Sequence, residues 1–144
     1  MKHSLYETDF YAWSNRQAAL LRAGKLSEAD ITNIAEEIES MGKTEKRELV
    51  SRLRVLMLHL LKWKFQPSLR SPSWLATIKS QRFDIARHMK DNPSLKSQVA
   101  DSVEWAYEGA QLDATAETGL PAKIFPPTCP WSFSEMTGAE FWPD

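Results

Sequence analysis

Residues 35–74 read AEEIESMGKTEKRELVSRLRVLMLHLLKWKFQPSLRSPSW, and this stretch decides the fold. Its centre, VLMLHLL at 55–61, is apolar except for His59. The pattern predicts a helix from Glu45 to about Phe65, where Pro67 ends it by excluding the helical conformation from the residue before it. A helix this apolar belongs in a core. The carboxylates before it and the cations after it therefore need partners when they are buried.

Caps, glycines and prolines predict further helices on both sides of this one. Two precede it, one from residue 9 to 23 that ends at Gly24, and one from residue 27 to about 41. Gly42 either stops the second of these or bends it. Two follow it, one capped by Ser73 and one that begins at Asn92-Pro93 and ends at Gly119. No stretch alternates as a half-buried strand does. We therefore predict an all-α fold, a small antiparallel helical bundle of four to five helices.

The C-terminal segment differs in composition from the rest of the chain. Five prolines follow Leu120 and exclude another long helix. Large apolar residues such as Phe125, Trp131 and Phe133 make it unsuited to an exposed linker. The sequence therefore predicts one domain over 1–144, in which 9–119 form the helical core and 120–144 form an irregular strap packed on the bundle.

Charge and cysteine content exclude several classes of protein. The chain of 144 residues carries 19 acidic and 18 basic residues, so no overall field favours nucleic acid or an anionic membrane. Cys129 is the single cysteine, which excludes an intrachain disulfide and a thiolate zinc site within one chain. The N-terminus lacks a signal-peptide core, and the longest apolar run is too short to span a bilayer. We expect a cytoplasmic protein.

Several short sequence motifs resemble, in their order and spacing, those of a bacterial family known as domain of unknown function twenty-nine. They are YETDFYAW at 6–13, EEIE at 36–39, HLLKW at 59–63, SW at 73–74, Ile78 with QR at 81–82, NPSL at 92–95, ETGL at 117–120, and FP at 125–126 with CP at 129–130. The resemblance covers the chain from end to end. It implies a small all-helical bundle, and it implies no activity, because the family offers no catalytic or binding residues to transfer.

His59 is the residue that most invites a chemical role. It could bind a metal or act as a general base, with carboxylates from Glu36, Glu39 or Glu117. The sequence has no His-x-x-x-His or Glu-x-x-His pair, which metal sites in helical bundles commonly use. We expect His88 to face solvent. We therefore favour a histidine satisfied by a carboxylate or carbonyl, and we predict neither a catalytic residue nor a cofactor.

A buried ion pair explains the remaining polar residues without any reaction. Arg82 falls in the apolar stripe of its helix between Ile78 and Ile85, where an unpaired guanidinium is costly. Glu36 and Glu39 share one helix face and are the predicted partners. We therefore predict a structural polar cluster of Glu36, Glu39, His59 and Arg82.

Three functions remain open. The favoured one is a protein-interaction module, acting with an unidentified protein or as a homodimer, since aromatic residues are frequent at interfaces. A metal-assisted hydrolase using His59 with Glu36, Glu39 or Glu117 is the second, although we lean against an enzyme. The third is a nucleic-acid-binding or antitoxin-like accessory protein that uses Lys62, Lys64 and Arg70, beside tryptophans on which bases could stack.

Overall fold

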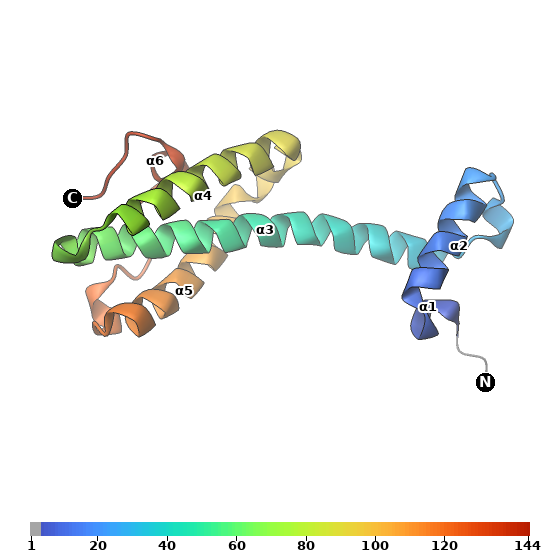
Figure 1. Cartoon of the computed structure of the whole chain (residues 1–144), viewed down its shortest axis with the longest axis horizontal. Helices are drawn as coiled ribbons and strands as arrows, with labels where there is room; N and C mark the ends of the chain where they lie inside the picture. Colours follow the sequence, from blue (N-terminus) through green and yellow to red (C-terminus); the bar gives the residue numbers. More distant parts are fainter. Residues whose placement is uncertain (1–3) are drawn as a thin grey trace. The chain divides into compact units, whose positions relative to one another are not determined.

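The computed structural model describes residues 4–144, which divide into two compact units, Met1–Thr44 and Glu45–Asp144. We call them the N-terminal and C-terminal units (Figure 1). The described residues form six α helices and four short 3-10 helices and contain no strand, which confirms the all-α prediction. That 1–144 is a single domain stays a prediction.

The N-terminal unit contains α1 (Leu5–Thr8), α2 (Phe10–Arg22) and the first part of α3 (Ile31–Phe65). Asp9 caps α2 by accepting a hydrogen bond from the backbone N–H of Ala12 at 3.0 Å. Gly24, at φ +72°, turns the chain after α2, in the left-handed conformation that favours glycine.

Trp13 is the centre of the small interior of this unit. Its indole Nε1–H donates to Asp30 Oδ2 at 3.1 Å, and its ring contacts those of Tyr6 and Phe10. The Tyr6 hydroxyl donates to Glu37, a hydrogen bond that raises the pKa of Tyr6 to about 12. These contacts join α1, α2 and α3 within the unit.

Helix α3 runs without interruption from Ile31 to Phe65, so the boundary predicted near Gly42 is wrong. The helix also begins later than predicted, because residues around Ser27 form a 3-10 turn, Leu26–Glu28. An exposed glycine inside a helix costs only about 1 kcal/mol, which good helix formers on either side outweigh. Gly42 therefore neither stops nor caps the helix.

The C-terminal unit packs α4 (Pro72–Asp91) and α5 (Val99–Thr118) against the rest of α3 (Figure 1). Ion pairs join residues of α3 and α4 in opposite order along the two helices: Glu48–His88 and Arg52–Asp84. Three others join α3 and α5 in the same order: Lys46–Asp101, Arg54–Asp113 and Lys62–Glu117. The three helices therefore run up, down and up, as an antiparallel bundle requires of successive helices.

The apolar face of α3 supplies most of the core. Its fully buried residues recur at helical spacing: Leu49, Leu53, Leu56, Met57, Leu60 and Leu61. Helix α4 adds Ile78 and Ile85, and α5 adds three small residues, Ala106, Ala110 and Ala114. This confirms the prediction that His59 and its leucine neighbours lie on the most buried helix.

Helix ends follow the predicted chemistry with small shifts. Ser71, rather than Ser73, caps α4 by accepting from the backbone N–H of Trp74 at 3.2 Å, with Pro72 in the first turn. A 3-10 segment, Pro93–Gln98, precedes α5. Gly119, at φ +72°, ends α5 as predicted.

The C-terminal segment 120–144 packs on the core of its unit. Phe125, Trp131 and Met136 are buried there, and Phe133 packs against them with partial exposure. Within this segment, predicted to be irregular, lies one short helix, α6 (Phe133–Thr137), which begins with a reciprocal cap between Ser132 and Glu135.

Arg82 holds this segment through backbone carbonyls. Its Nε donates to Met136 O and its Nη2 donates to Phe141 O, both at 2.7 Å. The guanidinium also lies 5.0 Å from the centroid of the Trp142 ring. The guanidinium thus has other partners than Glu36 and Glu39, the carboxylates that the sequence predicted for it.

We expect Arg82→Ala to lower the free energy of unfolding by roughly 3 kcal/mol, because it removes two charge-assisted hydrogen bonds and leaves carbonyls without donors. Arg82→Lys should fall between this variant and wild type, since one ammonium cannot reproduce the planar fork. Urea denaturation measures both. Arg87→Ala on the same helix is the control, because Arg87 is exposed and its ion pair is a solvated one with Asp91 four residues on. Equal midpoints for Arg82→Ala and Arg87→Ala would contradict this anchoring role.

Phe125→Ala should lower the free energy of unfolding by about 3–5 kcal/mol, the usual cost of removing a buried aromatic ring. Phe125 is 2% exposed and meets the Phe65 ring edge-on, at 5.3 Å between centroids. Its neighbour Ile124 is 43% exposed, so Ile124→Ala is the matched control. Thermal unfolding followed by circular dichroism should separate the two, and two identical melts would show that the strap adds little to stability.

Candidate functional site

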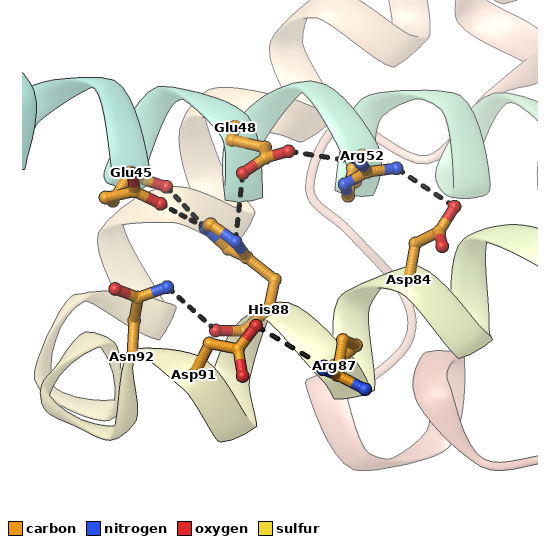
Figure 2. Close-up of polar contacts among 8 residues, drawn as sticks. All are labelled: Glu45, Glu48, Arg52, Asp84, Arg87, His88, Asp91 and Asn92. Atoms are coloured by element: carbon orange, nitrogen blue, oxygen red, sulfur yellow. Dashed lines mark hydrogen bonds and ion pairs between the residues drawn. The ribbon is translucent and has the colours of Figure 1, made fainter.

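His88 lies between two glutamates of α3, near the end of α4 (Figure 2). We call Glu45, Glu48 and His88 the His88 cluster. The Nδ1 of His88 is 2.9 Å from Glu48 Oε2, and its Nε2 is 2.8 Å from the backbone oxygen of Glu45. The carboxylate of Glu45 lies 3.6 Å from the same Nε2. Both ring nitrogens therefore face oxygen acceptors.

The sequence builds this cluster from simple helical spacing. Glu45 and Glu48 are three residues apart and so share one face of α3. Because α4 runs opposite to α3, its last turn lies beside them, and His88 follows the buried Ile85 by three residues. Asn92 closes the turn by donating from Nδ2 to the backbone oxygen of His88 at 3.1 Å.

A chain of charges leads away from the cluster (Figure 2). Glu48 Oε1 accepts from Arg52 Nη2 at 3.1 Å, and Arg52 Nη1 donates to Asp84 Oδ2 at 3.1 Å. The side chains of Glu45 and Glu48 are 44% and 42% exposed, whereas that of His88 is 8% exposed. Partly solvated pairs of this kind contribute little stability each, about 0–1 kcal/mol. The buried imidazole of His88 is therefore the group of this cluster that most needs its hydrogen-bond partners.

Chemically, the cluster can hold a cation between a nitrogen and a carboxylate oxygen. Its three residues can each offer one ligand atom, and these atoms lie within 4.8 Å of one another. It is the one such group of histidine, cysteine and acidic side chains found over residues 4–144.

The sequence had led us to expect His88 on the solvent side, but the residue is 7% exposed, so this expectation is wrong. The position of His88 on α4 is the sequence feature that indicates its burial. Ile78, Arg82 and Ile85 form a buried stripe at spacings of four and three residues, and His88 continues it three residues later. Companion carboxylates on another helix could not be identified without knowing how α4 pairs with α3.

His59 does not take part in the cluster. Its ring Nδ1–H donates to Val55 O at 2.8 Å on the same helix, and burial lowers the pKa of the half-buried imidazole. Glu117 lies close enough to influence it, but this carboxylate accepts from Lys62 Nζ at 3.0 Å.

The carboxylates predicted to join His59 are distributed over the chain. Glu36 and Glu39 are exposed residues of the N-terminal unit, whereas His59, Arg82 and Glu117 belong to the C-terminal unit. His59 is thus satisfied by a carbonyl, one of the two partners that the sequence suggested for it.

The basic residues proposed for nucleic-acid binding are engaged within the protein. Lys62 is buried, with its Nζ 4.9 Å from the Trp74 ring centroid. Arg70 donates from Nε to Trp63 O at 2.8 Å, and its guanidinium lies over the Trp63 ring. Lys64 is placed over the Phe65 ring at 5.8 Å. Nucleic-acid binding stays a prediction, for which a salt-dependent titration is the test.

Cys129 lines a groove of about 350 Å³ beside α5 together with Glu104, Tyr107 and Glu108. Burial raises the pKa of its thiol, and Sγ donates to Trp131 O at 3.3 Å. The residues that line the groove include no histidine. A thiol with a raised pKa and no adjacent base is a packing residue rather than an activated nucleophile.

His59 should make the protein less stable in mild acid. Burial lowers its folded-state pKa below 6.5, so the unfolded chain binds the proton more tightly. The stability it contributes is complete above about pH 6.5 and falls as the pH drops through the unfolded-state pKa. Urea denaturation at pH 7.5 and pH 5.5 should show a smaller loss for His59→Gln than for wild type. His88 is present in both proteins, so equal losses would contradict this role.

Comparison with known proteins identifies the family of the chain. No curated protein and no solved structure matches the chain. The family model described as domain of unknown function DUF29 matches residues 5–142, nearly the full length. The chain therefore belongs to the DUF29 family.

Proposed function

We propose that this chain is a protein-interaction module whose N-terminal unit pairs with a second copy of the chain. One observation carries the proposal, the apolar surface of that unit. Among the described residues of 4–44, eight large apolar side chains are exposed: Leu5, Phe10, Tyr11, Leu21, Leu26, Ile31, Ile38 and Met41. Residues 45–144 expose five, although they form the larger unit. Apolar surface at this density is typical of a protein interface.

The N-terminal unit also buries too little to be stable by itself. Over residues 4–44, Trp13 and Gln17 are the buried side chains. Units of about 40 residues without disulfides or metals usually need association to reach a stable fold. A partner that covers the exposed apolar side chains would supply the missing core.

The spacing along α3 supports a helical partner. Ile31, Ile34, Ile38 and Met41 recur at intervals of three and four residues and so share one face of the helix. Such a stripe is the pattern by which one helix packs along another. The two longer helices of the unit are α2 and the first part of α3, so two copies would provide the four helices of a four-helix bundle, which supports a second copy as the partner.

The proposed location is the cytoplasm. The single free cysteine supports it, since it suits a reducing compartment. Over the described residues, no helix has both the length and the apolar content needed to cross a bilayer.

Analytical ultracentrifugation over a range of concentrations tests the proposal. We expect the wild type to be a dimer and the double variant Ile38→Glu/Met41→Glu to be monomeric, because each charge would be desolvated at the interface. Leu112→Glu is the matched control, since Leu112 is an equally exposed apolar residue of α5 in the C-terminal unit. A wild type that stays monomeric at every concentration would overturn pairing with a second copy. Dimers that survive the double substitution would place the interface elsewhere.

A further inference from the structure

We propose that Glu45, Glu48 and His88 form a binding site for a divalent transition-metal ion of the zinc class. The proposal is independent of the N-terminal unit and of self-association. It rests on the geometry of the two ring nitrogens and on the two carboxylates that face them.

The first step concerns Nε2 of His88. It lies 2.8 Å from the backbone oxygen of Glu45, and a carbonyl oxygen can only accept a hydrogen bond. Nε2 therefore carries a hydrogen and donates it. A neutral imidazole with its hydrogen on Nε2 presents a lone pair at Nδ1.

The second step concerns Nδ1. It faces Glu48 Oε2 at 2.9 Å, and an ionised carboxylate is likewise an acceptor only. Two lone pairs at this distance repel each other unless a positive charge lies between them. A proton fills the position when the ring is an imidazolium. A metal ion fills it when the ring is neutral, in which case the Nδ1 proton leaves to solvent and the Nε2–H hydrogen bond is kept.

The surroundings match those of histidine metal ligands. A ligating histidine usually donates its other ring N–H to a carbonyl or carboxylate, which fixes the ring orientation. The hydrogen bond from Nε2 to Glu45 O already has this form. The carboxylate of Glu45 lies on the Nε2 side of the ring, with Oε2 at 3.6 Å from Nε2, so its side chain must turn toward Nδ1 to bind the same ion.

The distance of 2.9 Å between His88 Nδ1 and Glu48 Oε2 is close to that between two ligands of a tetrahedral ion. Bonds of about 2.0–2.1 Å place neighbouring ligand atoms roughly 3.3 Å apart, so Glu48 Oε2 would move by only a few tenths of an ångström. Glu45 and Glu48 are partly exposed and can rotate to do so, and water can reach a fourth position. Glu48 would bind through Oε2 alone, since its Oε1 accepts from Arg52.

The donor set selects the class of ion. One imidazole with two carboxylates and no thiolate suits zinc and similar first-row ions. Magnesium and calcium prefer oxygen ligands alone, so they should bind this site more weakly. The competing account is that the cluster is an ion pair and binds only a proton.

Titration of zinc chloride into the full-length protein without an affinity tag tests the proposal by calorimetry. We expect one zinc ion per chain, with proton release seen as a heat that depends on the ionisation enthalpy of the buffer. His88→Gln should weaken binding by roughly tenfold or more, because it removes the nitrogen ligand. His59→Gln is the matched control and should bind as wild type does, since His59 donates to Val55 O outside the cluster.

Two further measurements keep the result decisive if His88→Gln folds poorly. Glu48→Gln keeps the size and the hydrogen-bonding oxygen of the side chain while removing its charge, so it should fold and still bind zinc more weakly. Cobalt(II) added to the wild type should give the visible absorption of a low-coordinate ion, and His88→Gln should lack it. A wild type that binds no zinc at millimolar concentration, or binding that is unchanged in both His88→Gln and Glu48→Gln, would show that the cluster is an ion pair alone.

Discussion

Burial of one side of α3 is the constraint on which the C-terminal unit depends. From Leu49 to Leu61 the helix carries a row of fully buried leucines, and each exposed leucine would cost about 1.5–3 kcal/mol. Ile78 and Ile85 of α4 cover part of this surface, and the small alanines of α5 pack against it as well. The segment after Gly119 completes the cover with Phe125, Trp131 and Met136. The prolines in that segment fix its path, and Arg82 attaches it to α4.

Several charged side chains that lie close to this core pair with one specific partner. Lys62 reaches Glu117 on α5, and Arg54 makes two hydrogen bonds to Asp113. The Arg54 pair holds the pKa of Asp113 below its usual range. His88 takes the corresponding place between α4 and α3, but its partners are two carboxylates and a carbonyl. Two carboxylates around one buried imidazole distinguish this cluster from the one-to-one pairs of Lys62 and Arg54.

Local sequence rules predicted the elements better than their partners. Periodicity located the buried helix, and Gly24 and Gly119 marked helix ends because each adopts the left-handed conformation that favours glycine. The helix boundary predicted near Gly42 was wrong, because a glycine that keeps helical dihedrals does not end a helix. Arg82 was recognised as a buried cation, but its acceptors are backbone carbonyls of the strap, which no side-chain pattern reveals. The partners of His88 depended on the register between α4 and α3, a long-range property that spacing along one helix does not contain.

We propose that one continuous helix serves two units of different character, a C-terminal unit that contains the hydrophobic core and an N-terminal unit that needs a partner. Hydrogen exchange along α3, followed by mass spectrometry at two protein concentrations, tests it most directly. We expect amides of residues 49–61 to exchange slowly at both concentrations, and amides of residues 31–44 to exchange faster and to become protected as the concentration rises. Uniformly slow exchange along α3 that does not change with concentration would contradict the account.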